Sequence, residues 1–291
     1  MRSLLFVPAD SERKQEKALG SGADVLILDL EDSVAGSRKP VAREMAARFI
    51  AARHDGPRLY VRVNGLSSGL TDGDLAAVMP ARPDGVMLPK ANGAGDVMRL
   101  AAKLRVHEAE NGFDDGETRI LPIITETARG VLSAASYARA LPRLCGVTWG
   151  AEDLSASVGA SAYRDAEGCY TDLFRLARSV TLLAAAASET AAVDTVFPDF
   201  RDEAGLARDC TEAARDGFTA KMAIHPAQVP IINTAFTPSQ EAVENARAIV
   251  AAFAEAGNPG VLSLGGRMYD RPHLRLAERL LARAGAGRQI A

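Results

Sequence analysis

The most restrictive feature of this sequence is a regular alternation of short apolar, β-branched runs with longer stretches of helical spacing. Eight of the runs have the length and composition of buried strands. They are Ser3–Pro8, Val25–Leu30, Leu59–Asn64, Gly85–Pro89, Ile120–Thr125, Gly146–Trp149, Ala192–Phe197 and Ala220–Ile224. Such alternation predicts parallel strands joined by right-handed crossovers. Because there are eight strands and no glycine-rich dinucleotide turn, we predict an α/β fold, a closed (β/α)8 TIM barrel.

The alternation ends at a turn-forming segment near residue 257. The stretch Ser239–Ala256 has the spacing of a last barrel helix, and the sequence Gly-Asn-Pro-Gly follows it. We therefore predict a catalytic barrel over residues 1–256 and a small C-terminal extension over residues 257–291. The extension contains a helix at Arg271–Ala284, with Pro272 in its first turn. About 30 residues are too few to bury a core, so we expect the extension to pack on its own barrel or on a neighbouring subunit.

Composition and charge narrow the class of protein. The 291 residues carry a formal net charge of -3, and 5% are aromatic, so no nucleic-acid footprint is present. Cys145, Cys169 and Cys210 are widely spaced without a C-x-x-C pair, which is typical of reduced thiols. No apolar stretch has the length of a membrane span, and the N-terminal apolar run is shorter than a signal-peptide core. We expect a soluble, cytoplasmic protein with neither nucleic acid nor membrane as a partner.

Polar side chains follow the fifth and sixth predicted strands, in Ile123–Glu126 and Thr148–Asp153. In a parallel barrel such polar ends meet at one mouth. Glu126 and Asp153 belong to neighbouring strands, and two close carboxylates repel unless a cation lies between them. No cysteine or histidine is near, so an oxygen-preferring ion fits best, and we predict Mg²⁺. The alternative is that both acids are helix caps or members of surface ion pairs.

An arginine and three acids occupy the ends of the second and third strands. Arg62 keeps its charge at the barrel mouth and therefore needs an anion. That anion is either a structural partner, Asp29 or Glu31, or a substrate carboxylate or enolate oxygen. Helix capping needs only Asp32 or Ser33, so we expect a role in the site for at least one of these acids. Strand alternation places Asp29 and Glu31 on one face and Asp32 on the other.

Two further motifs carry weaker signals. Residues 65–69 match the G-x-S-x-G pattern, but Leu70–Asp74 reads as further loop, so we expect no nucleophilic serine there. His225 closes the eighth strand next to Pro226. It is either a general base or a histidine that bonds the neighbouring backbone, and we favour the second interpretation.

Together these segments resemble the citrate lyase β-subunit-like branch of the HpcH/HpaI aldolase superfamily. The residues that carry the resemblance are Leu5–Pro8 with Arg13 and Lys17, Leu28–Asp32, Val61–Asn64, Leu88–Lys90, Glu126, Glu152–Asp153, Phe197–Asp202 and Lys221–Pro226. The tail segment Gly266–His273 is similar to the C-terminal motif of the malyl-CoA and citramalyl-CoA lyases, although Arg267 and Tyr269 depart from that motif.

The resemblance implies a Mg²⁺-dependent lyase acting on a malyl-, citramalyl- or citryl-type 3-hydroxyacyl-CoA thioester. The products would be acetyl-CoA and a 2-oxo acid. It also implies a homo-oligomer, a trimer or a dimer of trimers, in which Asp270 reaches the active site of an adjacent subunit. Two alternatives stay open: a thioesterase that hydrolyses the same CoA esters, and a citrate lyase β-subunit that works only within a complex.

The resemblance also implies roles for individual residues. Asp270 would be the acid-base catalyst and Arg62 would stabilise charge that develops on oxygen, while Glu126 and Asp153 would bind the metal. The residues expected to bind substrate are Arg62, Glu126, Asp29, Glu31, Arg13, Lys17, Met222 and Ala223. Among these, Arg13 and Lys17 would contact the phosphates of CoA, and the backbone of Met222 and Ala223 would contact its pantetheine arm.

Overall fold

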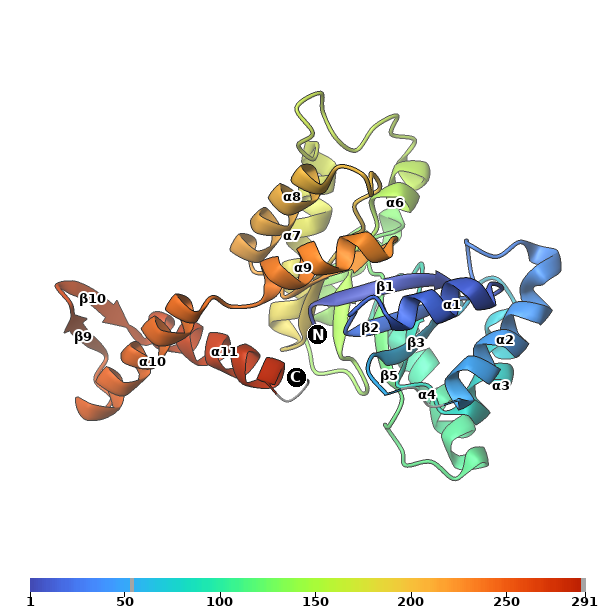
Figure 1. Cartoon of the computed structure of the whole chain (residues 1–291), viewed down its shortest axis with the longest axis horizontal. Coiled ribbons are helices and arrows are strands. Elements are labelled where there is room, and N and C mark those ends of the chain that lie inside the picture. The colour runs from blue at the N-terminus through green and yellow to red at the C-terminus, as the bar shows by residue number, and fades with distance from the viewer. Residues whose placement is uncertain (53–54, 289–291) are drawn as a thin grey trace. The chain divides into compact units, whose positions relative to one another are not determined.

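The computed structural model of the protein describes residues 1–52 and 55–288 and divides the chain into two compact units (Figure 1). The first unit is Met1–Asn233 and the second is Thr234–Ala291. No helix in the described ranges is both long enough and apolar enough to cross a membrane.

The first unit contains one parallel sheet of eight strands. They are β1 (Ser3–Pro8), β2 (Val25–Asp29), β3 (Arg58–Arg62), β4 (Gly85–Leu88), β5 (Arg119–Pro122), β6 (Gly146–Thr148), β7 (Ala191–Asp194) and β8 (Ala220–Ala223). The strand order is β5-β4-β3-β2-β1-β8-β7-β6. The end strands β5 and β6 are joined by parallel bridges from Ile120 to Leu144 and from Ile123 to Thr148. The predicted (β/α)8 barrel is therefore confirmed.

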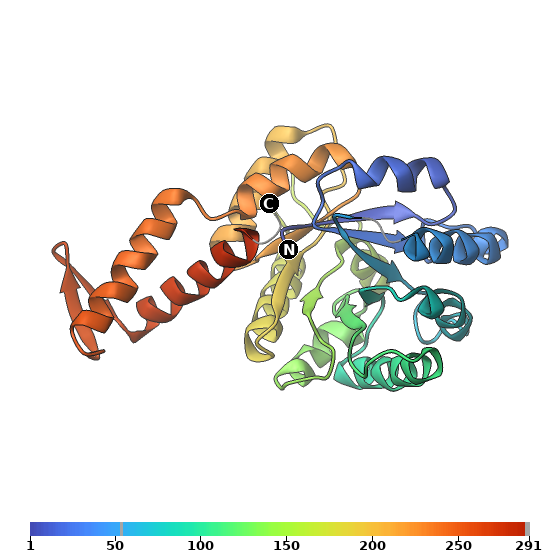
Figure 2. The same cartoon turned by 60° about the horizontal axis from the view of Figure 1, so that its bottom comes forward.

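Helices connect the strands and lie outside them (Figure 2). They are α1 (Glu12–Leu19), α2 (Lys39–Ala51), α3 (Thr71–Val78), α4 (Ala94–Asn111), α5 (Ala128–Ser133), α6 (Ala151–Val158), α7 (Asp172–Ala187), α8 (Glu203–Asp216) and α9 (Val229–Phe236). Helix α3 begins at Thr71, so the expectation that Leu70–Asp74 is loop was wrong. Its first turn is polar, and only Leu75 and Val78 supply buried apolar side chains. This pattern is too short to show helical periodicity.

Alternate residues of the strands fill the barrel interior. The buried cluster includes Leu4 of β1, Val25 and Ile27 of β2, and Tyr60 of β3. Because side chains alternate along a strand, the next inward position after Ile27 is Asp29, and the next after Tyr60 is Arg62. The apolar layers thus give way to charged residues at the carboxyl ends of the strands.

The second unit has a small core of its own. Helices α10 (Gln240–Glu255) and α11 (Arg271–Arg288) flank an antiparallel hairpin of β9 (Val261–Leu264) and β10 (Arg267–Asp270). The hairpin turns at Gly265 and Gly266, which both have positive φ, as a tight two-residue turn requires.

The observed boundary at residue 234 differs from the expected one at residue 257. The buried cluster of the second unit joins Ala246, Ile249 and Phe253 of α10 to Leu274 and Ala277 of α11. Helix α10 therefore buries its apolar face against α11, and the short helix α9 follows β8 instead. The extension acquires a core because it includes α10.

Candidate functional site

The parallel register of β2 and β3 places Asp29 beside Arg62. Arg62 donates two hydrogen bonds to Asp29, from Nε to Oδ1 at 2.7 Å and from an Nη to Oδ2 at 2.6 Å. The backbone N–H groups of Glu31 and Ser33 also donate to the Asp29 carboxylate, at 2.9 and 3.1 Å. Asp29 is 1% exposed, and its oxygens are engaged by these four donors. It is placed to orient the guanidinium of Arg62.

A second carboxylate, Glu31, also faces Arg62. An Nη atom of Arg62 lies 3.1 Å from Glu31 Oε2, and the guanidinium lies over the ring of Phe6, 4.7 Å from its centroid. Asp32 is exposed whereas Asp29 and Glu31 are buried, which agrees with the alternation predicted for this strand end. The structural ion pair considered for Arg62 is thus present, and Arg62 also lines a pocket.

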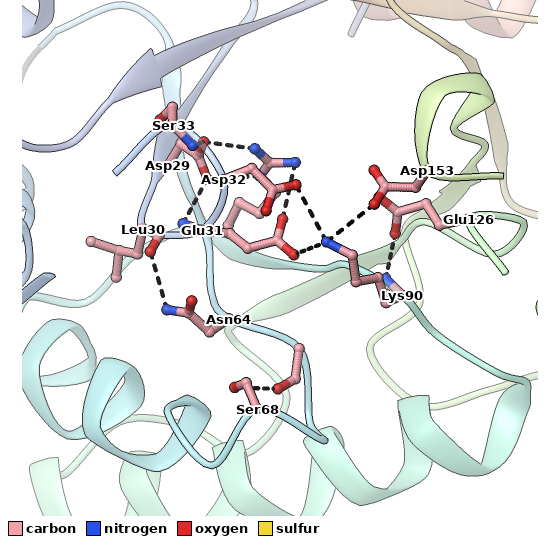
Figure 3. Close-up of polar contacts among 12 residues, drawn as sticks. Asp29, Leu30, Glu31, Asp32, Ser33, Asn64, Ser68, Lys90, Glu126 and Asp153 are labelled. Carbon is pink, nitrogen blue, oxygen red and sulfur yellow. Dashed lines mark hydrogen bonds and ion pairs between the residues drawn. The ribbon is translucent and has the colours of Figure 1, made fainter. Parts of the chain in front are cut away.

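That pocket lies at the barrel mouth and has a volume of about 70 Å³, enough for several water molecules. Arg62, Glu126, Asp153 and Met222 all line it. Glu126 follows β5 and is 3% exposed, whereas Asp153 lies in the first turn of α6 and its side chain is 34% exposed. Figure 3 shows their carboxylates next to each other.

Glycine at position 150 allows Glu126 to occupy this place. A Cβ atom at Gly150 would lie 2.9 Å from Cγ of Glu126. The residue immediately before α6 must therefore lack a side chain if Glu126 is to keep its position.

Burial and like charge raise the pKa of Glu126. Burial is the larger cause, the neighbouring Asp153 carboxylate adds to it, and the pKa rises from 4.5 to about 8. Burial also raises the pKa of Glu31. In contrast, burial alone would raise the pKa of Asp29, but the hydrogen bonds and charge of Arg62 outweigh it and hold that pKa below its ordinary value. Burial and the neighbouring Asp153 therefore both oppose ionisation of Glu126.

The donor set fits a hard divalent cation. Glu126 and Asp153 supply carboxylate oxygens. The two carboxylates repel each other, and a cation bound between them would offset this repulsion. Within residues 1–52 and 55–288, no group of three or more His, Cys, Asp or Glu residues is arranged to hold a metal. Two carboxylates completed by water and substrate oxygens are the usual environment of Mg²⁺, which retains water ligands.

The predicted CoA contacts lie on β8 and α1. Met222 and Ala223 are buried in β8, and Met222 reaches the pocket. Arg13 and Lys17 are exposed and lie one turn apart on α1, the helix that follows β1. Because α1 begins beyond the carboxyl end of β1, Arg13 in its first turn lies on the mouth side of the barrel.

Asp270 is the last residue of β10 in the second unit. Its Oδ1 atom lies 2.5 Å from Nδ1 of His273 in the first turn of α11, and the side chain is 43% exposed. This hydrogen bond holds the pKa of Asp270 below its ordinary value. The two residues meet because α11 begins at Arg271, directly after β10, and His273 lies in its first turn, three residues after Asp270.

The two weaker motifs have structural roles. In the G-x-S-x-G segment, Ser67 at the central position is exposed, and the hydroxyl of the neighbouring Ser68 donates to the backbone oxygen of Gly65 at 2.6 Å. Nδ1 of His225 accepts a hydrogen bond from the N–H of Ala227 at 3.2 Å and so caps the short helix Pro226–Gln228.

Lys90 is a residue of the mouth to which sequence reasoning assigned no role. Its Nζ atom lies 2.5 Å from Glu31 Oε1 and 3.3 Å from both Asp32 Oδ2 and Asp153 Oδ1 (Figure 3). Its backbone N–H donates to Glu126 Oε2. The signal that marked the other site residues, a polar side chain after a buried strand, is also present here, because Lys90 follows β4 and Pro89.

Comparisons with known proteins agree with this arrangement. The model of the HpcH/HpaI aldolase/citrate lyase family matches residues 2–226. A citrate lyase subunit beta-like protein of Mycobacterium tuberculosis is 40% identical, over 97% of this chain and 94% of its own length. A (3S)-malyl-CoA thioesterase of Cereibacter sphaeroides is 36% identical (98% and 95%), and the mitochondrial citramalyl-CoA lyase of Rattus norvegicus is 33% identical (97% and 86%).

A solved structure shows the same fold. The crystal structure of CitE from Mycobacterium tuberculosis, in complex with magnesium, acetoacetate and coenzyme A, superimposes with a TM-score of 0.78. It is 38% identical in sequence, and the match covers 98% of each chain. The family model and these relatives extend over the barrel and the mouth described above. The chain belongs to the HpcH/HpaI aldolase/citrate lyase family.

Proposed function

We propose that this protein is a Mg²⁺-dependent carbon–carbon lyase that cleaves a 3-hydroxyacyl-CoA thioester of the malyl-, citramalyl- or citryl-CoA type. The bond between C2 and C3 breaks, the hydroxyl group at C3 loses its proton and becomes the carbonyl of a 2-oxo acid, and C2 gains a proton to give acetyl-CoA. The observation that carries the proposal is the pocket that joins Arg62 to Glu126 and Asp153 at the carboxyl ends of the strands.

Glu126 and Asp153 would hold the Mg²⁺ ion. When bound, the ion acts as a Lewis acid on substrate oxygens and as a template for their orientation. The relative solved with magnesium and coenzyme A supports both ligands for this chain. Glu126 is ionised when it holds the cation, because the positive charge offsets the burial and repulsion that otherwise favour its protonated form.

Arg62 would stabilise the negative charge that develops on oxygen as the bond breaks. Its guanidinium is fixed by the two hydrogen bonds to Asp29 and by Glu31, so it needs no reorientation during the reaction. We propose that Asp29 and Glu31 contribute to substrate binding indirectly, because they orient Arg62. Among the charged residues of the barrel mouth, we expect Arg62 and Glu126 to touch the acyl part of the substrate directly.

Asp270 would transfer the proton at C2, in the pocket of a neighbouring subunit of a homo-oligomer. The hydrogen bond from His273 favours the ionised carboxylate, which is the form that accepts a proton from the acetyl carbon in the reverse, condensation direction. Arg13 and Lys17 would pair with phosphate groups of CoA, and backbone groups of Met222 and Ala223 would contact its arm.

The test is an assay of the purified chain with malyl-CoA and with citramalyl-CoA, in which both products are identified. We expect acetyl-CoA and a 2-oxo acid in equal amounts, no activity after exhaustive chelation, and recovery on addition of Mg²⁺. Full activity in metal-stripped protein, verified by metal analysis, would contradict the assignment of the cation.

The (3S)-malyl-CoA thioesterase among the relatives is the observation that favours a second candidate. A thioesterase releases free CoA and intact malate or citramalate, so a thiol reagent together with organic-acid analysis separates the two reactions. A citrate lyase β-subunit that depends on a complex would be inactive on both CoA esters as an isolated chain.

A further inference from the structure

Lys90 is held at the barrel mouth by its backbone as well as by its side chain. It has a φ of 53°, in the left-handed region that is unfavourable for a residue with a side chain. In this conformation its N–H donates to Glu126, and its side chain crosses to the carboxylates of Glu31, Asp32 and Asp153. An unfavourable backbone conformation that is retained at a candidate site suggests a function for the residue.

The charges at the mouth explain what that function is. The charge of Asp29 is matched by its bidentate partner Arg62. Four further carboxylates lie at the mouth, those of Glu31, Asp32, Glu126 and Asp153. Arg62 also contacts one of them, Glu31. The ammonium of Lys90 contacts three of the four. It lies 3.3 Å from Oδ1 of Asp153, one of the two carboxylates to which we assign the divalent cation.

We infer that the Lys90 ammonium competes with the divalent cation for Asp153. The ammonium pairs with Asp153 when no cation is bound, and it is displaced toward Glu31 and Asp32 when a cation binds. This inference rests on the proposed function, because it takes Glu126 and Asp153 as the cation ligands. An ammonium on one of these ligands lowers cation affinity in two ways: it must be moved from Asp153, and it repels the incoming ion. Lys90 thus sets the Mg²⁺ concentration at which the site fills.

The experiment measures Mg²⁺ binding by calorimetry on metal-stripped full-length protein, without substrate. Lys90→Met keeps an unbranched side chain and removes the charge, so we expect Mg²⁺ to bind about tenfold more tightly than to the wild-type protein. The melting temperature without Mg²⁺ should fall, and saturating Mg²⁺ should recover most of the difference. Lys90→Arg keeps the charge and should bind Mg²⁺ as the wild-type protein does.

Lys103→Met is the matched control. The Lys103 side chain is 33% exposed and that of Lys90 is 35%, and Lys103 also pairs with an aspartate, Asp72, at 2.6 Å. Its removal should leave Mg²⁺ affinity unchanged. If Lys90→Met does not fold, Lys90→Asn replaces it, because asparagine is neutral and tolerates positive φ.

Failure of the inference and failure of the proposed function give different results. If the wild-type protein binds no Mg²⁺, the assigned cation is wrong and the inference fails with it. If the wild-type protein binds Mg²⁺ but the folded neutral variants bind it equally or more weakly, only the competitor role of Lys90 is overturned.

Discussion

The guanidinium of Arg62 combines a buried ion pair with a place in the pocket wall, and substitution by lysine separates these two roles. Lysine keeps the positive charge that Asp29 requires, but it lacks the planar fork that binds two oxygens at once. We therefore expect Arg62→Lys to remain folded and to lose roughly 2–4 kcal/mol of transition-state stabilisation, the typical loss for one oxyanion donor. The measurement is kcat/KM for the CoA ester, with circular dichroism as the check of folding.

Arg43→Lys is a suitable control, because Arg43 also pairs with a buried aspartate, Asp74, with Nε and Oδ1 2.8 Å apart. Its side chain is 19% exposed, against 12% for Arg62. The control should lose some stability without losing activity. Unchanged turnover of Arg62→Lys would leave Arg62 with only its structural ion pair.

The raised pKa of Glu126 predicts a pH dependence of stability in the absence of divalent cations. The pKa is 4.5 in the unfolded chain and about 8 in the folded protein, so the folded protein binds this proton more tightly. Stability from this group is complete below about pH 4.5 and is lost as the pH rises to about 8, at no more than about 1.4 kcal/mol per pH unit. Urea unfolding with a chelator should show this slope in the wild-type protein.

Glu126→Gln lacks the titrating group, and its unfolding free energy should fall less steeply with pH. The unfolding free energy of the variant, relative to that of the wild-type protein, should therefore increase as the pH rises from about 4.5 to about 8. A difference that is constant from about pH 5 to about pH 8 would contradict the assignment of the raised pKa to Glu126.

At the level of strands and helices, a buried ion network connects β7, β8 and α8. The register pairs Asp194 with Lys221, and Lys221 is fully buried with Nζ 2.7 Å from both Asp194 and Asp209. The indole N–H of Trp149 donates to Asp194 at 2.7 Å, and Trp149 also lines the pocket. The network therefore links the outer face of the barrel sheet to the segment that carries Gly150 and Asp153.

Removing the ammonium group of Lys221 from this network should strongly destabilise the folded protein. Lys221→Met leaves two buried carboxylates without their shared partner, so we expect the unfolding free energy to fall by about 3–5 kcal/mol. Trp149 is the only tryptophan of the chain, and its fluorescence should change in the same variant. A loss no larger than that of the exposed-pair variant Lys103→Met would show that the network contributes little.

The sequence predicted those elements whose apolar periodicity is long enough to be recognised. The strand ends also placed Arg62, Glu126 and Asp153 at the mouth, because the topology of a parallel barrel gathers the carboxyl ends of its strands. The contacts of Lys90 were not predictable, since they depend on a left-handed backbone residue and on four acids from three separate strand ends. The sequence of helix α10 was interpreted as a barrel helix because an amphipathic pattern predicts that one face of a helix is buried. The pattern does not identify the element against which that face packs.

At the level of the whole molecule, the proposal that Asp270 serves a neighbouring subunit predicts complementation between two inactive variants. Asp270→Asn and Arg62→Ala should each abolish cleavage, while Asp270→Asn retains Mg²⁺ binding, because Glu126 and Asp153 are unchanged. Co-expressed with different affinity tags, the two variants should form mixed oligomers. Half of the barrels and half of the tails are then intact, so random assembly should restore about one quarter of wild-type activity.

The control is a mixture of the two separately purified variants under conditions in which subunits do not exchange, and it should stay inactive. Asp270 and His273 are held together within the second unit, so His273→Ala in place of Asp270→Asn tests whether the pair acts together. If tandem purification recovers mixed oligomers and they remain inactive, Asp270 acts on its own barrel or has no part in the chemistry. Rescue would mean that the hairpin, with its tight turn at Gly265 and Gly266, completes the site of another copy of the chain.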